Sequence, residues 1–187
     1  YNNLEQLKKN VIGGYNLSCI GDERQHSCML TKYGNTQSDY AILDAYKKLK
    51  LKFKIYSFLK RGSDERQYNS PGIDLPIASI FRTKYGEYPE YHTSLDNFDL
   101  VTEKGLKGGF LVAKTAIENL LNKIIPKNKV FCEPFMEKRK IYKQVYMSFL
   151  QYADGSLDIN QISKKLKLKI KETKKINKIL KKENLIN

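Results

Sequence analysis

Hydrophobic residues follow two different spacings in the first part of the chain. Residues 11–20 form a mixed apolar run that leads into a polar loop, as expected of a buried strand. Residues 37–49 carry apolar side chains at helical spacing, and Ser38 and Asp39 suit the first turn of that helix. Residues 51–59 alternate between apolar and polar positions, which predicts a second strand. The connection between the two strands is long enough for a parallel crossover through the helix.

A further apolar run, residues 75–82, predicts a third strand. Asp96 and Asn97 are placed to cap a long helix that begins near Phe98 and extends to about residue 124. Three glycines weaken its early turns and either allow close packing or mark a break: Gly105, Gly108 and Gly109. The order strand, helix, strand, strand, long helix predicts a three-layer α/β domain.

The pattern becomes entirely helical beyond Pro126. Residues 138–152, 157–166 and 170–180 each carry an apolar stripe at helical spacing, with a turn between the second and third segments. This arrangement predicts a winged-helix or helix-turn-helix module. We therefore expect two domains, residues 1–128 and residues 129–187.

The distribution of charge supports this division into two domains. Residues 1–130 hold 20 Lys/Arg and 14 Asp/Glu, a net charge of +6, whereas residues 131–187 hold 14 Lys/Arg and 6 Asp/Glu, a net charge of +8.

No apolar run approaches the roughly 18 residues needed to cross a bilayer, so we expect no membrane contact and a cytoplasmic location. The three cysteines lack Cys-x-x-Cys spacing and are expected to be reduced, mostly buried thiols: Cys19, Cys28 and Cys132.

The many lysines between residues 164 and 182 raise the question of nucleic-acid binding. Three features argue against it. Arginine, the main reader of bases, is absent after Arg139; the lysines are expected to spread around both helices; and few residues remain for a wing hairpin. We expect a packing or protein-contact role for this tail instead.

Candidate chemistry lies in two polar segments that flank the run at 75–82. The first, residues 63–68, contains Asp64, Glu65 and Arg66 between turn-forming residues. It is either a solvated loop with an internal ion pair or the wall of a cleft. In the cleft, Asp64 or Glu65 would meet a substrate amine and Arg66 a carboxylate.

The second segment, residues 91–97, contains one of the two histidines, His92; the other is His26. A lone histidine is more often structural than a metal ligand. His92, however, follows aromatic Tyr91 and precedes Asp96, and imidazole with carboxylate is a zinc-ligand combination. We therefore consider His92 a candidate ligand.

Two motifs resemble those of a known superfamily: Gly-Ile-Asp-Leu-Pro-Ile-Ala at residues 72–78, followed by Tyr-His-Thr-Ser-Leu-Asp-Asn at residues 91–97. Together they resemble the last metal-ligand segment of co-catalytic zinc aminopeptidases of the transferrin-receptor and glutamate-carboxypeptidase superfamily. Residues 61–97, with the basic tail, are also similar to a bacterial family of aminopeptidase-like proteins. Those combine a zinc-peptidase domain with a C-terminal winged helix and often accompany polysaccharide or surface-sugar biosynthesis. The resemblance spans nearly the whole chain from about Val11.

This resemblance implies a fold, a cofactor and a substrate. The fold is part of a three-layer, zinc-exopeptidase-like (phosphorylase/hydrolase-like) α/β domain, followed by an all-α winged-helix-like domain. The implied cofactor is zinc and the implied partner is a peptide or amide substrate. A homo-oligomer is compatible with the sequence.

The resemblance also assigns residues. It makes His92 a zinc ligand, while the family's ligand aspartate falls at Ser18, so Asp22 is the replacement candidate. Asp64 falls where the superfamily has a Ser-Asp-His-like segment near the substrate, with Glu65 in place of the histidine. We assign five residues to the substrate cleft: Asp64, Glu65, Arg66, Tyr68 and Tyr91.

Two patterns that the resemblance implies are absent from this chain. The enzymes need a His-x-Asp pair and a Glu-Glu pair for the remaining ligands and the general base. Neither occurs, and Cys28 stands two positions after His26. Either this is the C-terminal portion of a longer hydrolase, with its base before Tyr1, or it is a non-catalytic binding or regulatory protein that retains the fold.

Overall fold

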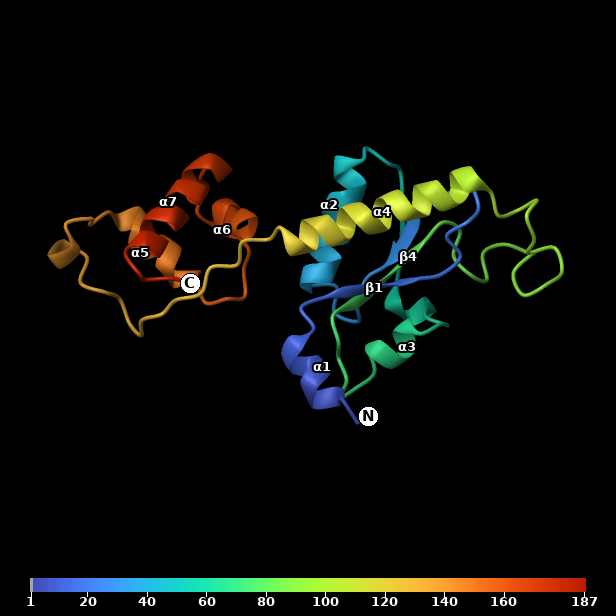
Figure 1. The fold of residues 1–187 in the computed structure, drawn as a ribbon, viewed down its shortest axis with the longest axis horizontal. Helices are drawn as coiled ribbons and strands as arrows, with labels where there is room; N and C mark the ends of the chain where they lie inside the picture. Colours follow the sequence, from blue (N-terminus) through green and yellow to red (C-terminus); the bar gives the residue numbers. More distant parts are fainter. Residues whose placement is uncertain (1) are drawn as a thin grey trace. The chain divides into compact units, whose positions relative to one another are not determined.

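The computed structural model describes residues 2–187, which form two compact units (Figure 1). The first unit ends at Asn122 and the second comprises Lys123–Asn187. The division into an aminopeptidase-like domain at residues 1–128 and a winged-helix-like domain at residues 129–187 stays a prediction. No helix among the described residues is long and apolar enough to cross a membrane.

A four-stranded mixed sheet forms the centre of the first unit. Its order is β1 (Gly14–Leu17), β4 (Ile77–Phe81), β2 (Ser27–Met29), β3 (Lys54–Tyr56). β4 runs parallel to β1 and antiparallel to β2, and β2 runs parallel to β3. Three of these strands lie within the runs that predicted them. The three-residue β2 was not predicted, and it is β2 rather than β1 that begins the parallel crossover to β3.

Helices lie on both faces of this sheet (Figure 1). α2 (Gln37–Lys48) and α4 (Glu103–Leu121) pack against each other and against β4, while α3 (Glu65–Tyr68) contacts β4 as well. Alternate strand residues therefore enter different cores: Ile80 packs with α2 and α4, and Phe81 packs with Tyr56 and Tyr85. The unit also contains α1 (Leu4–Asn10) and the 3-10 helix η1 (Phe58–Lys60). The architecture is mixed α/β; a zinc-exopeptidase layering remains a prediction.

The start of α4 differs from the prediction. Asn97 accepts a hydrogen bond from the Asp99 amide in a turn, and the helix begins only at Glu103, with Thr102 as its N-cap. The glycines serve close packing, because a Cβ on Gly105 would lie 1.8 Å from the carbonyl oxygen of Gly21. Side chains at this point would push α4 away from the loop that follows β1.

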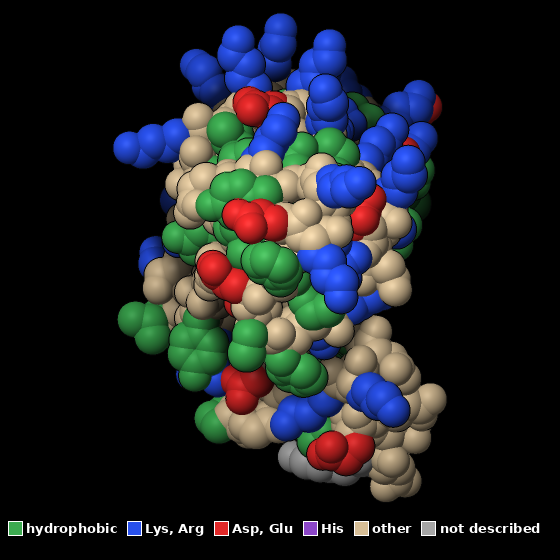
Figure 2. Space-filling view, turned by 90° about the vertical axis from the view of Figure 1, so that its left-hand side faces the viewer, with side chains coloured by type: hydrophobic (Ala, Val, Ile, Leu, Met, Phe, Trp, Pro, Cys, Tyr) green, Lys and Arg blue, Asp and Glu red, His purple; other side chains and the backbone are tan. Residues whose placement is uncertain are grey.

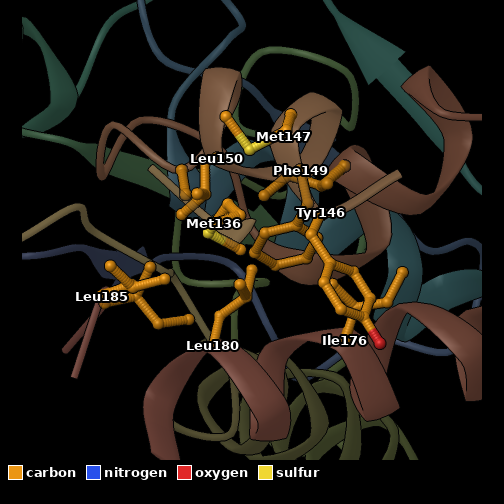
Figure 3. Close-up of a cluster of buried hydrophobic side chains, with 11 residues drawn as sticks. Met136, Tyr146, Met147, Phe149, Leu150, Ile176, Leu180 and Leu185 are labelled. Carbon is orange, nitrogen blue, oxygen red and sulfur yellow. The ribbon is translucent and has the colours of Figure 1, made fainter. Parts of the chain in front are cut away.

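The second unit is built from three α-helices around one apolar cluster (Figure 3). These are α5 (Gln144–Gln151), α6 (Ile159–Lys165) and α7 (Ile170–Lys182), preceded by the 3-10 helix η2 (Glu137–Arg139). The predicted helix at 138–152 begins late because Lys140 has a left-handed backbone, with a φ of 56°. Strand-like pairing within residues 123–187 is limited to two isolated bridges. A winged helix therefore remains a prediction.

The cysteines are less buried than expected. Cys28 is buried, Cys19 is half-buried and Cys132 is exposed. The expectation of mostly buried thiols holds for Cys28 alone. All three are free thiols.

Candidate functional site

A pocket of about 430 Å³ lies in the first unit between the loop that follows β1 and the segment that precedes α4. Asp22 lines it from the first side, and Tyr91, His92 and Asp96 line it from the second. Leu106 of α4 contributes part of the apolar lining. Both predicted metal ligands, together with one predicted substrate residue, thus face the same cavity.

Asp22 is bound tightly to the protein around it. Its carboxylate Oδ2 accepts from the Thr83 amide at 2.7 Å, and Oδ1 accepts from the Thr83 hydroxyl at 2.6 Å and from the Arg24 amide at 2.9 Å. The residue is only 5% exposed. These bonds attach the loop after β1 to the residues that follow β4, and any ligand role for Asp22 would compete with three protein donors.

A buried arginine reinforces the same junction. Arg82 Nε donates to the Asp22 carbonyl oxygen at 2.6 Å, and its Nη1 lies 3.0 Å from Nδ1 of His26. Burial, and then the positive charge of Arg82, lower the pKa of His26 from 6.5 to about 4. His26 is therefore neutral at neutral pH and accepts from the arginine. Its role is structural, and it does not line the pocket.

His92 contrasts with these buried and half-buried groups. It is exposed, its backbone φ is 61°, and its ring stacks on Tyr91 with centroids 4.0 Å apart. Among the described residues, its ring nitrogens have no hydrogen-bond partner. The ring is thus held by stacking while its nitrogens stay available to a ligand.

The residues at the pocket do not by themselves make a complete zinc site. Residues 2–187 contain no group of three or more His, Cys, Asp or Glu side chains placed to hold a metal ion. A zinc site needs at least three protein ligands. His92 fits the chemistry of one such ligand, and Asp22 is already engaged by protein donors.

Aromatic rings and one ion pair hold the segment that carries His92. Tyr91 contacts Tyr85 and Tyr88, with centroids 6.0 Å and 5.8 Å away. Glu90 forms a bidentate ion pair with the Arg24 guanidinium: Nη2 donates to Oε1 at 2.6 Å and Nη1 donates to Oε2 at 3.0 Å. This pair lowers the pKa of Glu90 to about 2. Arg24 belongs to the loop after β1, so the pair joins the two sides of the pocket.

The structure places Glu65 inside the protein rather than on a cleft wall, which corrects its predicted substrate role. It is 1% exposed. Its carboxylate accepts from the amides of Gly62 and Ser63 at 2.8 Å and 2.9 Å, and from the Tyr85 hydroxyl. Burial alone would raise the pKa of Glu65, but these hydrogen bonds hold it below its usual value.

The remaining predicted substrate residues lie apart from the pocket. Asp64 and Arg66 are on the surface, where Arg66 Nε donates to the carbonyl oxygen of Ser63. Tyr68 is 39% exposed and lines a different cavity of about 610 Å³, together with Leu4 and Leu7 of α1. The structure therefore brings Tyr91, but none of the other four, into the pocket with His92.

Sequence reasoning did not identify Arg82 and Thr83 as parts of this region. Arg82 is the last residue of a predicted strand and Thr83 follows it, and nothing in their local pattern marks them. Their importance depends on the pairing of β1 with β4, which brings the loop after β1 beside them. Tyr88 also lines the pocket, and its only sequence signal was its position near Tyr91.

Comparisons with known proteins agree with the aminopeptidase-like resemblance. A family model described as "Domain of unknown function (DUF4910)" matches residues 1–123. A Clostridium acetobutylicum protein named "Putative polysaccharide biosynthesis protein with aminopeptidase-like domain" is 33% identical over 147 residues. That match covers 75% of this chain and 32% of the relative.

A solved structure is similar over the whole chain. It is a crystal structure of a "putative peptidase" from Clostridium acetobutylicum, with a TM-score of 0.67 and 28% sequence identity. The likeness covers 100% of this chain and 44% of that one. The chain thus spans less than half the length of either relative. Together the likenesses support an aminopeptidase-like family and a mixed α/β fold.

Proposed function

The chain belongs to the DUF4910 family, and we propose that it forms part of a zinc-dependent aminopeptidase-like hydrolase that cleaves a peptide or amide bond. One observation carries the proposal: Asp22 lines the same pocket as Tyr91 and His92, which follow it by about 70 residues in the sequence. The names of the two relatives support the reaction class. A link to polysaccharide or surface-sugar biosynthesis follows only from the name of the curated relative.

The pocket suits a substrate with an apolar group beside a cationic one. Tyr88, Leu100 and Val101 provide apolar contact, while the carboxylate of Asp96 can pair with an amine. A peptide amino terminus has this chemistry, and so does an amino group close to another amide. We propose that Tyr91 forms the wall against which the substrate lies.

In this proposal His92 is a zinc ligand. Zinc would polarise the carbonyl of the scissile bond and lower the pKa of a bound water. The remaining ligands and the general base would come from residues outside this chain, which spans 32% of the curated relative. The chain's own residues orient the site: Tyr91 fixes the plane of the His92 ring, and Asp22 with Thr83 fixes the opposite loop.

The test is metal analysis of the full-length protein together with an assay of aminopeptidase activity on aminoacyl anilides. We expect stoichiometric zinc in the unaltered protein and in Ser94→Ala, an exposed neighbour. His92→Ala should lose most of the zinc and the activity. Absence of zinc in the unaltered protein, or zinc fully retained by His92→Ala, would refute the site.

The same experiment can identify a second candidate function, that of a non-catalytic binding protein. If the full-length protein binds peptides but holds no zinc and cleaves nothing, it is a non-catalytic binding protein that retains the fold. The pocket would then serve recognition alone. Binding that is weakened by Tyr91→Ala but not by Ser94→Ala would identify it.

A further inference from the structure

The lysines of α7 form one continuous stripe, contrary to the expectation that they spread around the helix. At 100° per residue, all six fall within an arc of about 120°. All six are exposed: Lys171, Lys174, Lys175, Lys178, Lys181 and Lys182. Figure 2 shows Lys and Arg side chains gathered at the top of the face it presents.

The opposite face of α7 is buried in the core of the second unit. Thr173, Ile176 and Leu180 are buried, and the last two pack in the cluster drawn in Figure 3. The helix therefore cannot rotate to hide its lysines. Its apolar side is also unavailable for insertion into a bilayer, which an interfacial helix requires.

Ion pairs within residues 2–187 do not neutralise the stripe. None of its six lysines forms an ion pair with any residue in the described range 2–187. The acidic residues Glu172 and Glu183 fall outside the 120° arc. Lysines three or four positions apart repel one another, for example Lys171 with Lys175 and Lys174 with Lys178. A bound polyanion would relieve this repulsion.

α6, a short turn and α7 follow one another, which is the order of elements in a helix-turn-helix. α6 and α7 pack together and are joined by a short turn in which Lys167 adopts a left-handed backbone, with a φ of 54°. The Leu168 amide donates to the Ser163 carbonyl oxygen at 3.0 Å and closes the turn. In such a motif the second helix is the one that enters the major groove of a duplex.

We propose that α7 binds the phosphate backbone of double-stranded nucleic acid without reading its sequence. Lysine is a point charge that suits phosphate, whereas base reading favours the planar fork of arginine, which is absent after Arg139. The helix carries no aromatic residue, so it lacks the stacking surface that single strands use. This inference goes beyond the proposed hydrolase function and does not depend on it.

The first measurement is binding of this 187-residue chain to a fluorescent DNA duplex of about 20 base pairs and mixed sequence, followed by anisotropy. If about four lysines contact phosphates, log K should fall against log salt with a slope of about −3.6. Affinity should then drop about 100-fold between about 50 and 200 mM salt. Two unrelated duplexes should bind equally well. No binding at the lower salt concentration, or a strong sequence preference, would overturn the proposal.

The second measurement compares two triple variants of equal charge. Lys171→Gln, Lys175→Gln and Lys178→Gln remove three of the six lysines of the stripe, and should weaken binding at least about tenfold and flatten the salt slope by about 2 to 3. The matched control removes three exposed lysines of the first unit: Lys47→Gln, Lys48→Gln and Lys114→Gln. An equal loss in the control would show that net charge alone is responsible and would refute the stripe.

Two further controls distinguish phosphate binding from a folding defect and from binding to other anions. Replacing the same stripe positions by arginine should retain phosphate binding, so loss in the glutamine variant cannot be ascribed to a general intolerance of substitution. Phosphatidylserine vesicles and poly-glutamate test other anionic partners. Tighter binding to either of these than to the duplex would overturn the assignment to nucleic acid.

Discussion

Two polar segments of the first unit look alike in sequence and behave differently in the structure. Residues 63–68 and residues 91–97 both combine ionisable, aromatic and turn-forming residues near β4. The first turns its central carboxylate, Glu65, into the protein, where backbone amides and Tyr85 bind it. The second leaves His92 exposed at a pocket. The number of protein donors and acceptors around a group therefore decides whether it is available to a ligand.

The difference has a local cause. α3 is a single short turn that begins at Glu65, so the preceding amides of Gly62 and Ser63 point toward its carboxylate. His92 instead lies in a turn with a positive φ, and its ring rests on the face of Tyr91. Stacking fixes the plane of a ring but leaves its nitrogens open.

The largest expected effect comes from removing the buried carboxylate. Glu65→Ala would leave the Gly62 and Ser63 amides and the Tyr85 hydroxyl without their acceptor in the interior. We expect the free energy of unfolding to fall by about 3 kcal/mol, measured by urea denaturation. Exposed Asp64→Ala is the matched control and should change it by less than about 0.5 kcal/mol. Similar losses in the two variants would contradict the anchoring role of Glu65.

The two histidines extend the comparison through their response to pH. The pKa of His26 is lowered to about 4 by burial and by Arg82, whereas an unfolded chain has a histidine pKa of about 6.5. Between these values the unfolded state binds a proton that the folded state does not. Stability should therefore fall on acidification from about pH 7 to pH 5, by about 1 kcal/mol once solvent screening of this half-buried ring is allowed for.

Substitution separates the histidines in this experiment. His26→Gln removes the titrating group, so the loss of stability between pH 7 and pH 5 should shrink by most of that amount. His92→Gln should retain it. A pH dependence that disappears with His92→Gln and persists in His26→Gln would show that His26 is not the histidine with the lowered pKa.

Local signals predicted the helices well. α2 begins with a capping box between Thr36 and Asp39, and α6 begins with one between Asp158 and Gln161. These pairs lie three residues apart and need no tertiary contact. The start of α4 was missed because Asp96 and Asn97 have the composition of a cap, whereas Thr102 is fixed by a distant partner, the carbonyl oxygen of Gly21.

The candidate site depends more on tertiary structure. The resemblance singled out His92 and Tyr91, and both line the pocket, but the sequence could not show that Glu65 would be buried. Its donors include Tyr85, which lies 20 residues away, and Asn16 of β1, at 3.3 Å. The β2 strand was likewise missed, because three residues carry too little periodicity to be recognised. The burial of Glu65 and the formation of β2 both depend on contacts between segments that are distant in the sequence.

The smallest expected effect is the one that most sharply separates a ligand from an anchor. His92→Ala removes an exposed ring whose nitrogens have no hydrogen-bond partner among residues 2–187, so only its stacking on Tyr91 is lost. The free energy of unfolding of this chain should change by less than about 0.5 kcal/mol. Tyr91→Ala should cost more, since that ring also contacts Tyr85 and Tyr88. A loss for His92→Ala as large as that for Glu65→Ala would make His92 a structural residue, and the proposed zinc ligand would have to be sought elsewhere.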